Sequence, residues 1–333
     1  MSLPGAALAE IVQARSQAIW VRVEQVRGSA PREPGASMCV TATQTVDTIG
    51  GGHVEFEAIA QARRMLVQGE RLAWRDVSLG ASHGQCCGGR MVLSWRRIDV
   101  REKDWVEALA ALDETGGRAW LITQQAPTAC APHTRLVMKP PAESPADAWL
   151  SEVEAWPWPV WVFGAGHVGE ALVRVLATLP LQLTWVDPRP EVFPAGLPSS
   201  VQCEELDSPV HAVSAIPSGA DVFVLTHSHA LDFDLCRALL ARDDLCAIGL
   251  IGSATKAARF RSRLARMGTD PARIARLRCP IGTPPTGAAD RHRLDRHPGA
   301  IAVAAAHELW SLRRAQQARL STLMSACPTE VTP

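Results

Sequence analysis

The sequence predicts an α/β protein in which a doubly wound parallel sheet in the C-terminal half follows a smaller mixed α+β domain. Beyond residue 159, short apolar runs alternate with segments of helical periodicity, and a glycine-rich turn connects the first run to the first helix. Such alternation is typical of parallel sheets. Between residues 140 and 159, closely spaced prolines favour an extended linker over a helix.

The N-terminal domain, residues 1–140, is expected to mix strands and helices. Alternation of apolar and polar side chains predicts strands at residues 18–26, 38–42, 91–95 and 118–123. Helical spacing of apolar residues predicts helices at 54–66 and 105–112. The buried face of the first helix is expected to carry Phe56, Ile59, Ala62 and Leu66.

A linker at residues 141–158 is expected to lead into a Rossmann-type domain at residues 159–315, followed by a flexible tail at residues 316–333. The strands of this domain are expected at residues 160–163, 181–186, 221–226 and 246–251. Its helices are expected at residues 170–177, 232–241 and 255–267.

The composition argues against several classes of partner. The 333 residues carry 34 basic and 34 acidic side chains, so neither nucleic acid nor a membrane is expected as a partner, because both select basic surfaces. The N-terminus lacks the basic and apolar regions of a signal peptide. Nine cysteines, an odd number, favour reduced thiols over a disulfide framework. We therefore expect a cytoplasmic protein.

The glycine-rich turn has the spacing of a dinucleotide-binding site. Gly164 permits a tight turn, Gly166 lets the backbone approach a phosphate, and Gly169 lets the helix pack closely. Backbone amides at the start of the helix would meet the phosphates, with His167 in the same turn. Asp187, at the end of the next strand, would accept hydrogen bonds from a ribose and repel a 2′-phosphate. An NAD-like dinucleotide is one candidate ligand, and a turn that serves only the fold is the alternative.

Two histidines, His227 and His229, follow the expected strand at 221–226. The carboxyl end of a parallel strand faces the ligand crevice. We therefore interpret both imidazoles as polar contacts to a ligand, and Asp232 as a helix cap. A metal site formed by these three side chains is the alternative, although the spacing differs by one residue from that of zinc hydrolases.

Two loops of the N-terminal domain have compositions that suit anion binding. Arg32 lies between prolines in a loop at 28–35, where its guanidinium would suit a phosphate or a pterin carbonyl. Gly50, Gly51 and Gly52 precede His53 at the start of a helix, where bare amides can approach an oxyanion. A surface salt bridge to Glu33 and a flexible hinge are the respective alternatives.

A third loop carries adjacent cysteines. Cys86 and Cys87 follow Gln85 and are flanked by glycines, which provide no packing around the sulfurs. Thiolates are soft metal ligands and nucleophiles, so these two residues are candidate ligands of a metal. A vicinal disulfide, a redox sensor and inert buried thiols are the alternatives.

These motifs together resemble the XdhC/CoxI family, the xanthine dehydrogenase accessory proteins. The resemblance extends from about residue 18 to 310. It rests on the segments at 28–35, 48–55, 84–89, 162–169, 226–232, 249–260 and 279–282. This chain departs from the family at Ser228, where an aspartate is usual, and after residue 282, where an insertion replaces the usual loop.

The resemblance implies an accessory protein and not an enzyme. Members of the family bind the molybdenum cofactor (molybdopterin), protect it, support its sulfuration with a cysteine desulfurase, and insert it into the molybdenum-binding subunit of xanthine dehydrogenase or a related hydroxylase. By resemblance, Gln85, Cys86 and Cys87 would contact the cofactor, with the molybdenum at the thiols, and a homodimer is implied. An NAD-dependent oxidoreductase that uses the Rossmann-type domain is the alternative function, and a metal-dependent hydrolase is a third.

Overall fold

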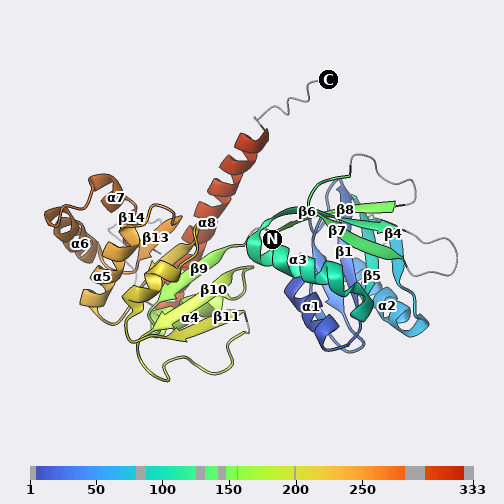
Figure 1. Ribbon diagram of the computed structural model, residues 1–333, viewed down its shortest axis with the longest axis horizontal. Coiled ribbons are helices and arrows are strands. Elements are labelled where there is room, and N and C mark those ends of the chain that lie inside the picture. The colour runs from blue at the N-terminus through green and yellow to red at the C-terminus, as the bar shows by residue number, and fades with distance from the viewer. Residues whose placement is uncertain are drawn as a thin grey trace. The chain divides into compact units, whose positions relative to one another are not determined.

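The computed structural model describes residues 5–79, 88–124, 132–141, 148–155, 157–198, 200–281 and 297–325. The chain forms two compact units, Met1–Pro157 and Trp158–Pro333 (Figure 1), each with its own hydrophobic core. None of the helices in the described part of the chain is long and apolar enough to span a membrane.

The first unit contains a five-stranded antiparallel sheet in the order β3-β2-β1-β5-β4. Its strands are β1 (Ala18–Arg27), β2 (Ser37–Val40), β3 (Thr45–Asp47), β4 (Leu72–Ser78) and β5 (Arg90–Ile98). Helix α2 (Gly52–Gln68) packs on one face through Val54, Ala58, Ala62 and Met65. The face predicted for this helix is wrong at Phe56, which is 71% exposed, because small residues let the helix approach the sheet along a different stripe.

A second antiparallel sheet, in the order β7-β6-β8, completes this unit. It consists of β6 (Gly117–Gln124), β7 (His133–Val137) and β8 (Ala148–Ala155), with helices α1 (Gly5–Gln13), η2 (Val100–Glu102) and α3 (Lys103–Thr115) packed nearby. Strand β8 corrects the linker predicted at 141–158. Ser151, Val153 and Ala155 alternate toward the core, and the whole strand pairs with β6.

The second unit is built on six parallel strands in the order β11-β10-β9-β12-β13-β14. The strands are β9 (Pro159–Phe163), β10 (Gln182–Asp187), β11 (Val201–Glu205), β12 (Asp221–Val224), β13 (Ala247–Leu250) and β14 (Leu277–Arg278). The order reverses between β9 and β12, and ligands of doubly wound sheets bind at the carboxyl ends of strands at such a point. The predicted Rossmann-type sheet is confirmed.

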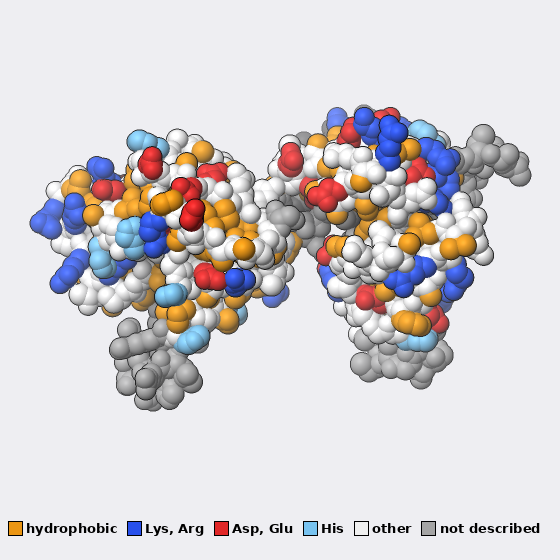
Figure 2. Space-filling model, turned by 90° about the horizontal axis from the view of Figure 1, so that it is seen from below, with side chains coloured by type: hydrophobic (Ala, Val, Ile, Leu, Met, Phe, Trp, Pro, Cys, Tyr) orange, Lys and Arg blue, Asp and Glu red, His pale blue; other side chains and the backbone are white. Residues whose placement is uncertain are grey.

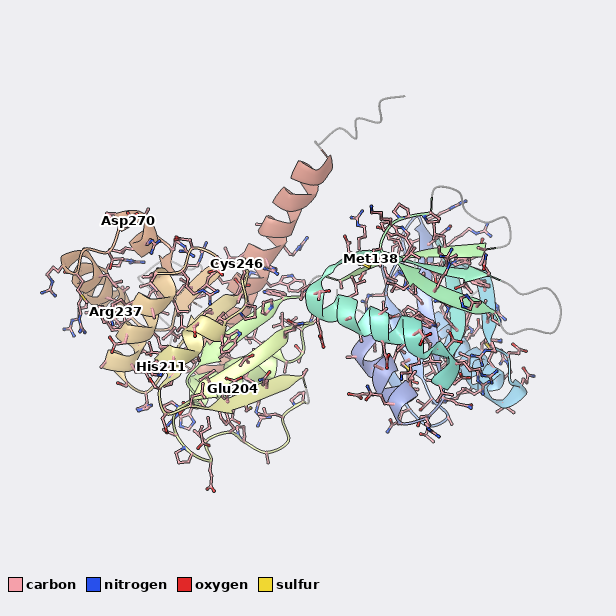
Figure 3. The ribbon with its side chains drawn as sticks, viewed as in Figure 1. Met138, Glu204, His211, Arg237, Cys246 and Asp270 are labelled. Carbon is pink, nitrogen blue, oxygen red and sulfur yellow. The ribbon has the colours of Figure 1, made fainter. Side chains whose placement is uncertain are left out.

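Helices cover both faces of this sheet. Helices α4 (His167–Leu176) and α8 (Pro298–Ser325) share one hydrophobic core. The other core takes side chains from η3 (Pro209–Ala215), α5 (His229–Leu240), α6 (Ala254–Arg266) and α7 (Pro271–Ala275). Asp270 caps α7 (Figure 3). Helix α8 continues to Ser325, which corrects the tail predicted from residue 316.

The surface carries charges of both signs. Figure 2 shows basic and acidic side chains on the face drawn. Of the free cysteines in the described residues, Cys39, Cys236 and Cys279 are buried as small core residues, whereas Cys203 is exposed on the edge strand β11. Burial raises the pKa of the Cys39 thiol to about 12.

Candidate functional site

In the first unit, two of the predicted anion-binding loops lie in contact. A Cβ added to Gly50, whose φ is +123°, would lie 2.6 Å from the Cβ of Pro31, so only glycine fits against the proline. The Arg32 guanidinium donates to the carbonyl of Thr48 at 3.3 Å and lies 3.4 Å from a carboxylate oxygen of Glu33. The structure therefore brings Arg32 and the triple glycine together.

The residues that flank the cysteine segment adjoin the same region. Gln85, Cys86 and Cys87 lie outside the described residues. A Cβ on Gly89 would lie 2.3 Å from the carbonyl oxygen of Ser29, and Gly89 accepts a hydrogen bond from the amide of Leu79 at 2.8 Å. The described flanks of all three motif segments are therefore adjacent in this unit.

The glycine loop already holds an anion, the carboxylate of Glu55. One oxygen of Glu55 accepts hydrogen bonds from the Thr48 hydroxyl at 2.5 Å, the Ile49 amide at 2.9 Å and the Gly51 amide at 3.0 Å. Burial alone would raise its pKa, but these hydrogen bonds hold the pKa of Glu55 below its ordinary value. A carboxylate four positions after a glycine at a helix start is the sequence feature that could have indicated this contact.

The first turn of α2 still offers a backbone donor. The amide of Gly52 has no partner within the helix, because the first four N–H groups of any helix lack an intrahelical acceptor. A Cβ on Gly51 would meet no atom within 4 Å, so the surface in front of this loop is open. The His53 imidazole is half exposed, with Nε2 3.2 Å from a carboxylate oxygen of Glu57.

In the second unit, the glycines of the turn divide into two kinds. A Cβ on Gly164 would lie 2.4 Å from the Leu225 carbonyl, and one on Gly169 would lie 2.1 Å from the Gly164 carbonyl. Both positions therefore require glycine for packing alone. A Cβ on Gly166 would meet nothing within 4 Å, which leaves open space at the start of α4, where His167 is also exposed. The turn retains the room that a phosphate needs.

Asp187 is fully buried and is occupied by internal partners. Its oxygens accept from the Ala165 amide at 2.6 Å, from the Arg189 amide at 3.0 Å, and from the Arg189 guanidinium at 2.8 and 2.9 Å. Burial would raise its pKa, but these donors keep the pKa of Asp187 below its ordinary value. The Asp187 carboxylate therefore binds the turn and Arg189 in this structure, and it is not a vacant acceptor for the hydroxyls of a ribose. Arg189 was not among the candidates from the sequence.

The histidine segment lies at the carboxyl end of β12. His227 and His229 are exposed, while Ser228 caps α5 by accepting from the Leu231 amide. Asp232 is not the cap that was predicted. It accepts from the Thr226 amide and hydroxyl at 2.9 and 2.7 Å and pairs with Lys256 Nζ at 2.5 Å.

This pairing weakens the metal alternative. Asp232 is 1% exposed and its carboxylate is committed to Lys256, which reaches it from α6. Within the part of the chain that the structure describes, no three histidine, cysteine, aspartate or glutamate side chains are grouped closely enough to hold a metal ion.

The fold and the loops define a two-domain protein. The antiparallel domain carries the motif loops, and the Rossmann-type domain carries an open glycine turn. Two family models match the chain: the XdhC Rossmann domain at residues 160–309, and the XdhC and CoxI family at residues 11–75. The chain belongs to the XdhC/CoxI family. This membership suggests an accessory role in the maturation of xanthine dehydrogenase.

One of the solved structures that match the chain has the same overall fold. A protein from Bacillus halodurans, described as a xanthine dehydrogenase, is 17% identical, with a TM-score of 0.69 over 94% of this chain and 96% of its own. A Rossmann-fold NAD(P)-binding family protein from Shigella flexneri is 18% identical, with a TM-score of 0.26 over 34% of this chain and 64% of its own. No curated protein sequence matches the chain.

Proposed function

We propose that this protein binds the molybdenum cofactor as cargo, protects it, supports its sulfuration by a cysteine desulfurase, and delivers it to the molybdenum-binding subunit of xanthine dehydrogenase or a related hydroxylase. The observation that carries the proposal is the adjacency of the motif loops in the first unit, with Gly50 against Pro31 and Gly89 against Ser29. The cargo combines a phosphate with a soft, oxygen-sensitive metal end. Amide and guanidinium donors suit the phosphate, and the thiols of the cysteine segment suit the metal end.

Each loop has a separate task in this proposal. The Arg32 guanidinium and the amide of Gly52 bind the phosphate or the pterin carbonyl, because they are donors on an open surface. The thiols of Cys86 and Cys87, next to Gln85, contact the molybdenum, since thiolates prefer soft metals. A second copy of the chain, as a homodimer, belongs to the same proposal.

The second unit has a supporting task. Its open turn at Gly166 and His167 binds a phosphate group, with His227 and His229 at the end of the neighbouring strand. Binding of an NAD-like dinucleotide at this turn is the second candidate, and the space in front of Gly166 favours it. Hydride transfer to simple substrates by the purified protein would support the oxidoreductase alternative.

The test is anaerobic binding of the molybdenum cofactor to the full chain and to a Cys86→Ser, Cys87→Ser double variant. Cys203→Ser is the matched control, because Cys203 is an exposed thiol in the other unit. We expect the double variant to lose most of its affinity for the cofactor, whereas the control keeps it. Full retention of binding in the double variant would overturn the assignment of the thiols.

A further inference from the structure

Helix α2 carries apolar side chains on two opposite faces. The stripe that packs on the sheet consists of Val54, Ala58, Ala62 and Met65. On the opposite face, Phe56 is 71% exposed and Val67 is 88% exposed, with Ala60 between them in the sequence. Residues four and seven positions apart lie on the same side of a helix, so these three side chains form one apolar line along the exposed face of α2.

Phe56 is the centre of interest in this line. Of the described phenylalanine and tryptophan side chains it is the most exposed, and Trp310 follows at 38%. Burial of apolar area is favourable, and large aromatic side chains are enriched among the residues that dominate binding at protein interfaces. An aromatic ring that the fold leaves in water is therefore a candidate anchor for a partner protein.

The position of Phe56 connects it to the proposed cofactor site. Phe56 lies one helical turn after Gly52, whose amide is the donor at the start of α2. The space in front of the loop is open, because a Cβ on Gly51 would meet no atom within 4 Å. A protein that takes a phosphate group from this loop has to approach through that space, and its surface then covers the first turn of α2.

The charges beside the apolar line favour an acidic partner. Arg63 and Arg64 are exposed on the same side of α2, and within the described part of the chain neither lies within 4.0 Å of a carboxylate oxygen. Arg64 donates only to the side-chain oxygen of Gln61 at 2.5 Å. Guanidinium groups without a carboxylate next to an apolar line fit an apolar pocket that is bordered by carboxylates.

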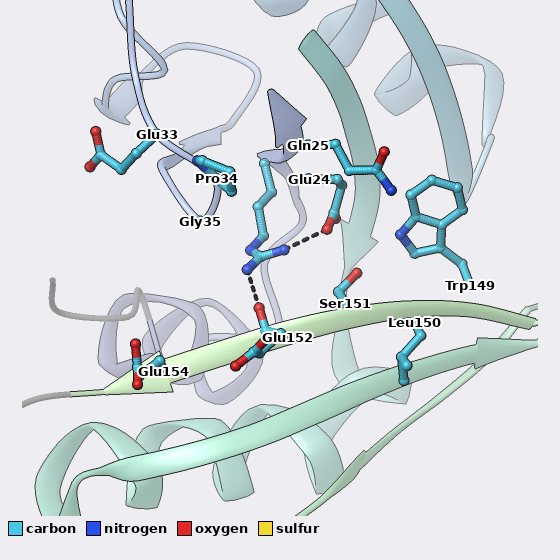
Figure 4. Close-up of a pocket in the computed structure, with 11 residues that line it drawn as sticks. Glu24, Gln25, Glu33, Pro34, Gly35, Trp149, Leu150, Ser151, Glu152 and Glu154 are labelled. Atoms are coloured by element: carbon cyan, nitrogen blue, oxygen red, sulfur yellow. Dashed lines mark hydrogen bonds and ion pairs between the residues drawn. The ribbon is translucent and has the colours of Figure 1, made fainter. Parts of the chain in front are cut away.

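The other side of the loop at residues 28–35 has the opposite charge. A cavity of about 450 Å³ between this loop, β1 and β8 (Figure 4) is lined by Glu24, Glu33, Glu152 and Glu154. Arg22 pairs with Glu24, and Arg118 pairs with Glu152 and Glu154, whereas the Glu33 side chain is 57% exposed. This wall repels an acidic partner, so such a partner is directed to α2.

We propose that the exposed face of α2, with Phe56 as its anchor and Arg63 and Arg64 at its border, is the docking surface for the subunit that receives the cargo, an inference that rests on the proposed function. The receiving subunit has to enclose the phosphate end of the cargo, which the proposed function assigns to the Gly52 amide. A cysteine desulfurase has to reach only the metal end. The face beside Gly52 is therefore assigned to the receiving subunit.

The test is the affinity of the full chain for the cofactor-free molybdenum-binding subunit of a xanthine dehydrogenase. We expect Phe56→Ala to raise the Kd at least about tenfold with an unchanged unfolding midpoint, because the ring is mostly in water. Val303→Ala is the matched control, since Val303 is a 59% exposed apolar residue on α8, and it should bind as the parent does. An unchanged Kd in Phe56→Ala, or no binding by the parent, would overturn the proposal.

A charge reversal tests the border of the surface. The double variant Arg63→Glu, Arg64→Glu should bind more weakly than the parent at low salt, and the difference should shrink as salt screens the charges. Arg259→Glu, Arg266→Glu is the matched control, because both arginines are exposed on α6 in the other unit. Equal weakening in the two double variants would show that net charge controls binding, and the assignment to α2 would fail.

The same variants examine other occupants of this face. Analytical ultracentrifugation of the parent and of Phe56→Ala measures self-association, and titration with a cysteine desulfurase measures the competing partner. If Phe56→Ala turns an associated parent into a monomer, or if it loses the desulfurase and keeps the receiving subunit, the proposal is wrong.

A titration with the molybdenum cofactor separates this proposal from the proposed function. If the parent binds the cofactor, and Phe56→Ala and Val303→Ala bind the receiving subunit equally well, the docking surface is wrong and the proposed function stands. If the receiving subunit binds through Phe56 but the parent does not bind the cofactor, the proposed function is wrong and the docking surface stands.

Discussion

Replacement of Glu55 by alanine should loosen the glycine loop and, at the same time, create an anion site. The carboxylate accepts from Thr48, Ile49 and Gly51, and these contacts hold a loop in which Gly50, Gly51 and Gly52 all have positive φ. Among the contacts of the described residues, no other acceptor binds both the Ile49 amide and the Gly51 amide.

The magnitude follows from the three hydrogen bonds. At a net contribution of about 1 kcal/mol each, their loss would cost about 3 kcal/mol. Because the side chain is only partly buried, water replaces some of this interaction. We therefore expect the free energy of unfolding of the first unit to fall by about 2 kcal/mol.

Urea unfolding of the full chain, followed by tryptophan fluorescence, measures this change. The control is Glu57→Ala on the same helix, where an exposed pair with His53 should contribute less than about 0.5 kcal/mol. Inorganic phosphate should then stabilise Glu55→Ala more than the parent, because it can occupy the vacated amides. If Glu55→Ala is as stable as Glu57→Ala and phosphate affects all three proteins equally, the carboxylate does not organise the loop.

Acid should reveal the same contact. The pKa of Glu55 is lower in the folded chain than its ordinary value of 4.5. Its stabilisation is therefore complete above pH 4.5 and is lost as the pH falls through the lower folded value. The pH dependence of unfolding below pH 4.5 should accordingly be shallower in Glu55→Ala than in the parent.

Three further predictions concern the second unit. Gly169→Ala should destabilise it by about 2 kcal/mol or more in urea unfolding, since its Cβ would overlap the Gly164 carbonyl, whereas Gly166→Ala, which meets open space, should change stability by less than about 1 kcal/mol; equal losses would contradict the division of the glycines. Lys256→Met should cost about 3–5 kcal/mol by leaving Asp232 buried without its cation, and a parent-like unfolding midpoint would show that the pair does not form. Asp187→Asn should remove stability at neutral pH but not at low pH, because the lowered pKa of Asp187 makes its contribution disappear as the carboxylate protonates; a constant difference between pH 7 and pH 2 would refute this.

The sequence predicted turns and strands more reliably than it predicted contacts between distant residues. It located the turn at Gly164–Gly169 and the strands around it, because glycine spacing and apolar runs are properties of neighbouring residues. It missed β8, where Ser151 and Glu152 interrupt the apolar pattern, and it oriented α2 by Phe56, although the alanine stripe is the one that packs.

The pairs at the candidate sites depended on contacts between distant parts of the chain. Asp232 meets Lys256 across 24 positions, and Arg22 on β1 meets the carbonyl of Glu152 on β8 across 130. No periodicity along the sequence encodes such contacts, because they depend on which strands lie side by side.

The sequence by itself determined that the chain has a doubly wound second half and the loops of the XdhC/CoxI family, since both are written in short, contiguous patterns. Only the tertiary structure decided which of those groups are available to a ligand. Glu55 and Asp187 are held by backbone amides and by Arg189, and the cavity beside Glu33 exists only where two separate sheets meet. The physical reason is that burial and hydrogen-bond satisfaction are properties of neighbours in space.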